Sequence, residues 1–298
     1  MRKCTLCPRN CAVNREKGEK GICGQTIEIK AARAALHYWE EPCISGSEGS
    51  GAVFFSGCPL HCVFCQNQNI ANGTAGKKIT TERLAEIFME LQQKGANNIN
   101  LVTAGHFAPQ VINALISAKE HGLSIPIVYN TSSYEAVETI KSLEGLVDIY
   151  LPDFKFMDES LSQKYSHAGD YSQVAKTAIA EMVRQTGPAV FRGGNEEGLM
   201  ERGTIVRHLI LPGCIEDSKR VIRYLYKTYG DNIYISIMNQ FTPLPGLEKY
   251  PELNRRVTEA EYEEVVDYAI SLGVECGFIQ EGETAEESFI PEFDGEGL

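Results

Sequence analysis

The chain has 298 residues, 43% of them hydrophobic, which is enough for one large α/β domain with an ample core. Its formal net charge of −12 argues against general affinity for nucleic acid, because that affinity depends on Lys and Arg neutralising phosphates. No apolar run approaches the ~20 residues that span a bilayer, and the first residues lack the apolar segment of a signal peptide. We therefore expect a cytoplasmic protein without a membrane or nucleic-acid partner, whose ten cysteines serve as metal ligands rather than disulfides.

Four of those cysteines lie near the N-terminus, where Cys4, Cys7, Cys11 and Cys23 have the spacing C-x₂-C-x₃-C-x₁₁-C. Glycines close to Cys23 let the backbone turn back, so that this residue can complete a four-ligand site. Four sulfurs suit either structural zinc or a [4Fe–4S] cluster, and the spacing leaves both open, together with unligated thiols. We predict that residues 1–51 form a cysteine-rich appendage and a connector, the connector covering residues 25–51.

A second group, Cys58, Cys62 and Cys65, has the spacing C-x₃-C-x₂-C and directly follows the apolar run 52–55. A strand at this run would deliver the cysteines into a loop at its C-terminal end. Three thiolates can hold three irons of a cubane cluster and leave the fourth iron open for a small molecule. The alternative is a zinc knuckle, which needs a fourth ligand, and His61 lies inside the spacer where the same ion is hard to reach.

From residue 52 onward, strand-like and helix-like patterns alternate. Strands are predicted at 52–56, 99–103, 125–130, 147–151, 205–211 and 233–238, with a shorter one at 276–280. Helices are predicted from Thr81 and at about 108–122, 133–143, 170–186, 216–229 and 258–272. Strands separated by single helices imply a parallel sheet with right-handed crossovers. We predict a partial (β/α)6 TIM-like barrel over residues 52–280 and an acidic C-terminal tail, 281–298, lying loosely on the surface.

The three-cysteine motif, with Phe64 just before its last cysteine, resembles that of the radical S-adenosylmethionine (SAM) superfamily. The resemblance implies a [4Fe–4S] cluster whose open iron chelates SAM, and one-electron cleavage of SAM to a 5′-deoxyadenosyl radical that abstracts hydrogen from a substrate. It also implies a partial barrel. Exposed low-potential clusters would further suit a low-oxygen, anaerobic setting. The phrase from Phe55 through Asn67 is typical of the pyruvate formate-lyase activating enzyme-like branch that carries an extra N-terminal cysteine group.

The resemblance also implies SAM-binding residues at the ends of the second and third strands. Gly105 and His106 stand where the family typically carries Gly-Gly-Glu, a departure that affects the contact with the SAM amino group. A neutral His106 could accept a hydrogen bond from the SAM amino group. Alternatively, it could pack behind the SAM-binding residues without contacting SAM. Asn130 and Ser132 occupy the position of an Asp-Thr-Asn-Gly motif, and their short polar side chains suit a ribose or carboxylate. A helix N-cap is the alternative for this stretch.

The next strand ends carry charged candidates. Asp153 and Lys155 match an Asp-x-Lys pair that fixes the methionine end of SAM in glycyl-radical activating enzymes, although a plain ion pair is the alternative. Arg207 and His208 lie in a strand similar to one of the same enzymes and point to opposite faces, so one of them should face the barrel. Gln240 ends the sixth strand. We treat Arg207, His208 and Gln240 as catalytic candidates, and Arg207 also as a ligand for a carboxylate.

Three functions remain open from the sequence. The first is activation of a glycyl-radical enzyme, with that enzyme and an electron donor such as flavodoxin or ferredoxin as partners. The second is a radical SAM reaction on a small molecule or a peptide; only Cys214 and Cys276 follow Cys65, too few for the extra clusters usual in peptide-maturing enzymes. The third is a non-catalytic iron–sulfur or zinc protein that acts as a redox carrier or scaffold.

Overall fold

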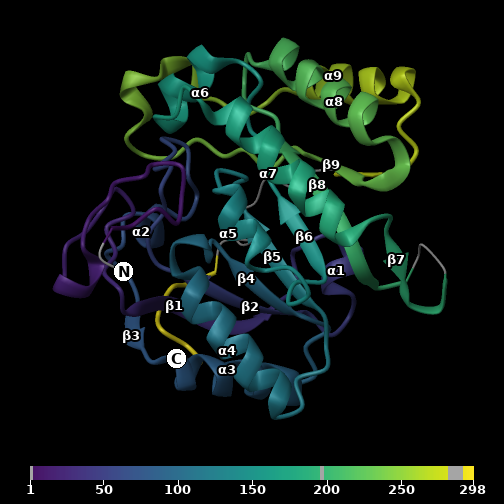
Figure 1. The fold of residues 1–298 in the computed structure, drawn as a ribbon. Helices are drawn as coiled ribbons and strands as arrows, with labels where there is room; N and C mark the ends of the chain where they lie inside the picture. The colour runs from purple at the N-terminus through teal and green to yellow at the C-terminus, as the bar shows by residue number, and fades with distance from the viewer. Residues whose placement is uncertain (1–2, 195–197, 281–290) are drawn as a thin grey trace.

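The computed structural model describes residues 3–194, 198–280 and 291–298, and within them the strands join one sheet (Figure 1). The strands are β1 (Ile29–His37), β2 (Ser50–Phe55), β3 (Lys77–Ile79), β4 (Ile99–Val102), β5 (Ile127–Thr131), β6 (Ile149–Pro152), β7 (Val190–Phe191), β8 (Met200–Leu209), β9 (Tyr234–Met238) and β10 (Gly277–Ile279). The helices are α1 (Pro42–Ser45), α2 (Gln68–Ala71), α3 (Thr81–Gln93), α4 (Ala108–Glu120), α5 (Val137–Lys141), α6 (Glu159–Ser166), α7 (Tyr171–Thr186), α8 (Ile215–Tyr229) and α9 (Glu259–Leu272).

The main path of the sheet runs β10-β9-β8-β6-β5-β4-β2-β1-β3. Every pairing from β2 to β10 is parallel, so all seven predicted strands are present and parallel. Helices connect these strands and cover the sheet, as parallel crossovers require. The path ends at β10 on one side and at β3 on the other, which confirms the prediction of an open, partial barrel.

The predicted helices form for the expected local reasons, with one shortened. In α3 the Thr80 hydroxyl accepts a hydrogen bond from the backbone N–H of Arg83, and the apolar residues at helical spacing are buried. The helix predicted over 133–143 is only α5, Val137–Lys141. Ser133 has a positive φ of 64°, so the backbone there turns before it can begin a helix.

The predicted connector contains a strand that the sequence analysis missed. β1 lies antiparallel to β2, with Ala34 opposite Val53 and His37 opposite Ser50. Its alanines are buried on both faces of the sheet, which removes the alternation of apolar and polar residues that would signal a strand. Small side chains fit where the sheet is covered on both sides.

Residues 291–298, here called the C-terminal strap, pack against β1 instead of lying loosely. The backbone N–H of Ala34 donates to the carbonyl of Glu296 at 2.9 Å, and that of Gly295 donates to the carbonyl of Ala32 at 3.0 Å. Arg33 forms ion pairs with Asp294 and Glu296. The strap therefore lies along the same edge of β1 as β3, next to the residues of β1 that follow those paired with β3. Residues 281–290 of the predicted tail lie outside the described residues.

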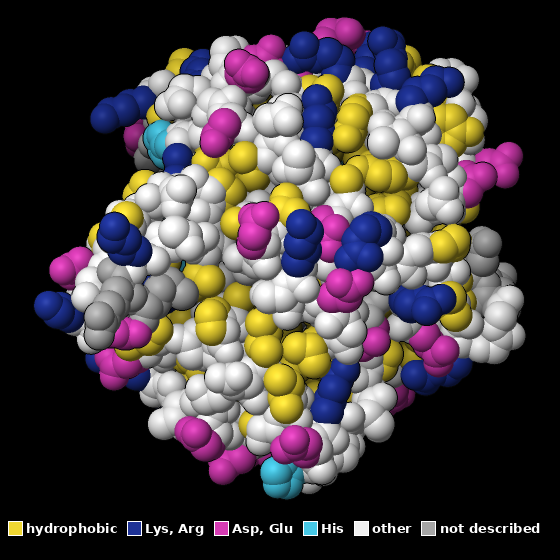
Figure 2. Space-filling model, viewed as in Figure 1, with side chains coloured by type: hydrophobic (Ala, Val, Ile, Leu, Met, Phe, Trp, Pro, Cys, Tyr) yellow, Lys and Arg dark blue, Asp and Glu magenta, His cyan; other side chains and the backbone are white. Residues whose placement is uncertain are grey.

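On the face seen in Figure 2, acidic and basic side chains are interspersed, with hydrophobic side chains between them. The net charge of −12 is thus not gathered into one acidic patch on this face. No helix within the described residues is both long and apolar enough to cross a bilayer.

Candidate active site

The C-terminal ends of the parallel strands surround a cavity of ≈250 Å³, the edge at which parallel α/β folds bind ligands. Its wall contains nine residues that the sequence analysis named as candidates. They are Cys58, Cys62, Cys65, Asn130, Ser132, Asp153, Lys155, Arg207 and Gln240. Residues from the loop after β2, from the ends of β5, β6 and β8, and from the segment after β9 thus meet at one place.

The three cysteines of this cavity are free thiols on the loop after β2, and hydrogen-bond donors point at their sulfurs. Backbone N–H groups of Leu60 and His61 are bonded to the sulfur of Cys58, and the Ser166 hydroxyl donates to Cys62 Sγ at 3.0 Å. Such donors stabilise thiolates. Burial, together with the charge of the neighbouring thiols, raises the pKa of Cys58 to about 11.

The same two causes raise the pKa of Cys65 to about 12. Three half-buried thiolates at one place therefore need a positive centre to hold them, and iron supplies one. The loop fits an iron–sulfur cluster, because three sulfurs face one cavity and carry donors of the kind that tune cluster potentials. Within the described chain, no set of three or more His, Cys, Asp or Glu side chains is arranged around a single metal ion.

Opposite the thiols, Arg207 is the centre of a buried polar network. Its guanidinium bonds to Glu40 Oε2 at 2.8 Å, to Asp153 Oδ1 at 2.9 Å and to Asn130 Oδ1 at 2.8 Å. Lys155 Nζ bonds to the other oxygen of Asp153 at 2.7 Å. Although burial opposes charge at Asp153, the two cations hold the pKa of its carboxyl below its ordinary value. The network thus keeps a fixed anion between two fixed cations.

Besides the four N-terminal cysteines, three of the candidate residues lie outside the cavity wall. His208 is turned away from it, with its ring nitrogens bonded to the carbonyl of Phe154 and the hydroxyl of Ser218, so Arg207 is the one of that pair that faces the barrel. His106 Nε2 lies 2.7 Å from the carbonyl oxygen of Ser56, and burial lowers the pKa of this imidazole to about 4. His106 is therefore neutral and lies outside the cavity wall.

Gly105, the third residue outside the wall, lies directly against a carboxylate that the sequence analysis missed. A Cβ on Gly105 would collide with the carboxylate of Glu135, which is fully buried and accepts a hydrogen bond from the Thr131 hydroxyl at 2.6 Å. A side chain at position 105 would therefore push this carboxylate away from Thr131. Glu135 had no sequence signal beyond following the end of β5.

Glu40, also missed, stands in the predicted connector beside another acidic residue, Glu41. This pair of acidic residues was the one feature of the sequence that could have marked Glu40 as a site residue. Glu40 lines the cavity, and besides its ion pair with Arg207 it accepts hydrogen bonds from the side-chain amides of Asn100 and Asn130. His37 and Trp39, from the same segment, also line the cavity.

Glu135 should make stability depend on pH. Burial raises the pKa of its carboxyl from 4.5 to about 7, so the folded protein binds a proton that the unfolded chain releases between these values. The contribution of Glu135 to the free energy of unfolding is full below pH 4.5 and is lost as the pH rises through 7. The linkage relation gives a loss of about 3 kcal/mol. Anaerobic urea unfolding of wild type and Glu135→Gln should show a flatter pH profile for the variant; parallel profiles would contradict this.

A comparison with protein families decides the nature of the site. The model of the radical SAM superfamily matches residues 52–201, which span β2 to the start of β8 and include the three cysteines. The chain belongs to the radical SAM superfamily. Membership brings a [4Fe–4S] cluster and SAM as cofactors and makes the chain an enzyme of the radical SAM type.

The chain is also similar to a relative of known sequence and to two solved structures. An uncharacterised protein of Methanocaldococcus jannaschii is 28% identical over 277 residues, which are 90% of this chain and 75% of that protein. SuiB of Streptococcus suis, solved with SAM bound, has a TM-score of 0.51 at 14% identity. The match covers 76% of this chain and 49% of the SuiB chain. HydG, a maturase of the [FeFe]-hydrogenase, has a TM-score of 0.51 at 15% identity, with 80% and 53% covered. The chain spans about half the length of these two structures, which show a shared fold.

Proposed function

We propose that this radical SAM enzyme holds its cluster on Cys58, Cys62 and Cys65 and activates a glycyl-radical enzyme. The observation that carries the proposal is the single cavity in which the three thiols face the Asp153–Lys155–Arg207 network. The Asp-x-Lys pair and the arginine on the next strand are the features in which this chain resembles activating enzymes.

The residues of the cavity have distinct tasks in this proposal. When bound, the reduced cluster and SAM supply the 5′-deoxyadenosyl radical, which abstracts a hydrogen atom. Lys155 and Asp153 offer a cation and an anion side by side, the complement of the amino acid end of SAM. Arg207 fixes Asp153 in place. Asn130 and Ser132 offer both donors and acceptors for a ribose.

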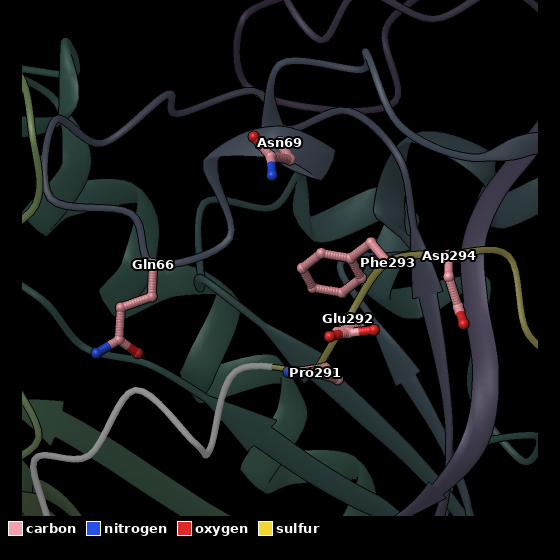
Figure 3. A pocket seen from close by; sticks show the side chains of 6 residues that line it. All are labelled: Gln66, Asn69, Pro291, Glu292, Phe293 and Asp294. Atoms are coloured by element: carbon pink, nitrogen blue, oxygen red, sulfur yellow. The ribbon is translucent and has the colours of Figure 1, made fainter.

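The mouth of the cavity supports a polypeptide substrate. Trp39 lines the cavity and is nevertheless 59% exposed, and Tyr38 beside it is 49% exposed. Large aromatic side chains of this kind carry much of the binding energy at protein interfaces. A neighbouring hollow of ≈390 Å³ lies between Gln66 and Asn69 on one side and residues 291–294 of the C-terminal strap on the other (Figure 3). Together they form an extended, partly apolar mouth that could receive a loop of a partner.

The experiment uses anaerobically reconstituted protein, SAM, a reductant and a glycyl-radical enzyme labelled with α-deuterated glycine. We expect an organic radical signal on the partner by electron paramagnetic resonance (EPR) and one deuterium in the 5′-deoxyadenosine formed. A partner whose radical-bearing glycine is replaced by alanine is the control and should give neither. If SAM is cleaved but no deuterium is transferred and no radical forms on the partner, glycyl-radical activation is wrong and a small-molecule substrate is favoured.

A further inference from the structure

The N-terminal cysteines are drawn together by backbone hydrogen bonds. The N–H of Cys4 donates to the carbonyl of Val13 and that of Ala12 donates to the carbonyl of Cys4, both at 3.0 Å, so this stretch folds back on itself. Cys11 Sγ packs against Gly21 so closely that a Cβ on that residue would collide with it. Cys4, Cys7 and Cys23 are buried, and Cys11 is half-buried.

Two of these thiols, Cys7 and Cys23, carry the same kind of donors as the cysteines of the active site. The backbone N–H of Arg9 is bonded to the sulfur of Cys7, and that of Gln25 to the sulfur of Cys23. The charge of Cys4 acts on both of these thiols, and that of Cys11 acts on Cys23. The four sulfurs therefore lie close enough to interact as one group, and because burial raises the pKa of Cys7 and Cys23, a metal centre is needed to hold them as thiolates.

Arg15 independently points to an anionic group at this place. Its side chain is buried, with 1% of the residue exposed, and its guanidinium donates to the carbonyls of Thr26 and His106. Among the described residues, no carboxylate lies within ion-pair distance of Arg15, whose charge instead acts on the thiol of Cys23. A buried cation needs a compensating anion, and four thiolates holding iron would supply it.

The N-terminal segment lies directly against the loop that bears the active-site cysteines. The carbonyl of Ile22 accepts a hydrogen bond from His61 Nε2 at 2.7 Å, and Arg9 Nε donates to the carbonyl of Pro59 at 2.8 Å. A Cβ on Gly57 would lie 2.5 Å from the carbonyl oxygen of Cys23, so the N-terminal segment touches the cysteine loop just before Cys58. The segments that bear the two cysteine groups are therefore joined by two side chain–backbone hydrogen bonds and one close approach of their backbones.

The segment is basic in an acidic chain. Residues 1–24 contain six Lys and Arg residues and two Glu residues, a net charge of +4, whereas the whole chain carries −12. Lys3, Lys17 and Lys20 are exposed. A local positive surface of this kind attracts a negatively charged protein and speeds its docking.

We propose that Cys4, Cys7, Cys11 and Cys23 hold a second [4Fe–4S] cluster, through which an acidic one-electron carrier docked on Lys3, Lys17 and Lys20 reduces the active site. This inference rests on the proposed cluster at Cys58, Cys62 and Cys65. The carrier, of the flavodoxin or ferredoxin class, loses one electron, and the active site gains the one electron that reductive cleavage of SAM consumes. No proton or further co-reactant is needed.

The metal content tests the site. Wild type should contain about eight irons per chain and no zinc, and Cys7→Ser about four, from the composition of two clusters and one. The EPR spectrum of the reduced wild type should show two interacting centres, and that of the variant one. One zinc and about four irons in the wild type would overturn the proposal, and so would about four irons alone.

The docking surface is tested without touching any cysteine. Reduction of the active site by reduced flavodoxin should be at least about tenfold slower in the triple variant with Lys3, Lys17 and Lys20 replaced by Glu, and its rate should lose its dependence on salt. Reduction by the uncharged deazaflavin radical should be unchanged. The matched control replaces the exposed Lys94, Lys119 and Lys227 with Glu and should behave as wild type.

Failure of this inference is distinguishable from failure of the proposed function. If both triple variants accept electrons from flavodoxin at the wild-type rate, the docking surface is wrong. SAM cleavage driven by deazaflavin would still stand in that case, because it needs the cluster on Cys58, Cys62 and Cys65 and not the lysine surface.

Discussion

Cys62→Ala should lose the active-site cluster and all cleavage of SAM. Its sulfur is one of three that face the cavity, and the variant leaves two ligands for a cluster that needs at least three. Iron should fall by about four atoms per chain, because the cubane contains four. Formation of 5′-deoxyadenosine, measured anaerobically with excess reductant, should drop to the level of a reaction without protein.

The control for this loss is Cys214→Ala. Cys214 precedes α8, is half-buried and lies outside the cavity, so its removal should leave iron content and SAM cleavage at wild-type levels. If the Cys62 variant instead turned over SAM, or bound as much iron as the control, the assignment of the cluster to this loop would be wrong.

The sheet could be predicted from the sequence because each parallel strand is a short apolar run between polar ends. β2, β4 and β6 are buried along their whole length, so their composition alone marks them. The carboxyl ends of such strands meet at one edge, which is why Asp153, Arg207 and the cysteine loop could be placed together before their contacts were known.

The parts that escaped prediction depend on contacts between distant segments. β1 carries no alternation because both of its faces are covered, and the C-terminal strap is held by Arg33, which is more than 250 residues away in sequence. Nothing local shows that His106 turns toward Ser56 or that Glu135 fills the space beside Gly105. These orientations are decided by burial and by the partners that tertiary packing supplies.

Arg207→Met should be the most destabilising change in the cavity wall outside the cysteines. The guanidinium pairs with Glu40 and Asp153, which are both largely buried, and methionine would leave Glu40 without a cation. Removing one partner of a buried ion pair typically costs about 3–5 kcal/mol of the free energy of unfolding. The stability of Arg207→Lys should lie between those of the wild type and Arg207→Met. An ammonium keeps the charge but cannot reproduce the three directed bonds of the guanidinium.

The pH dependence separates this electrostatic cause from simple loss of packing. In the wild type, the cations lower the pKa of Asp153 from 3.8, so its contribution to stability is full above that pH and is lost on acidification. The difference in the free energy of unfolding between wild type and Arg207→Met should therefore be full at pH 7 and should shrink only as the pH falls below 3.8. Anaerobic urea unfolding at several pH values measures it.

Arg184→Met provides the matched surface control. Arg184 also pairs with two carboxylates, Glu144 and Glu181, but its side chain is 53% exposed, and surface ion pairs contribute only about 0–1 kcal/mol. Affinity for SAM, measured by equilibrium dialysis, should fall in the Arg207 variant and stay unchanged in this one, because only Arg207 fixes the aspartate of the Asp153–Lys155 pair. Equal losses of stability in both variants, without a change in SAM affinity, would mean that the buried network neither supports the fold nor positions the cofactor.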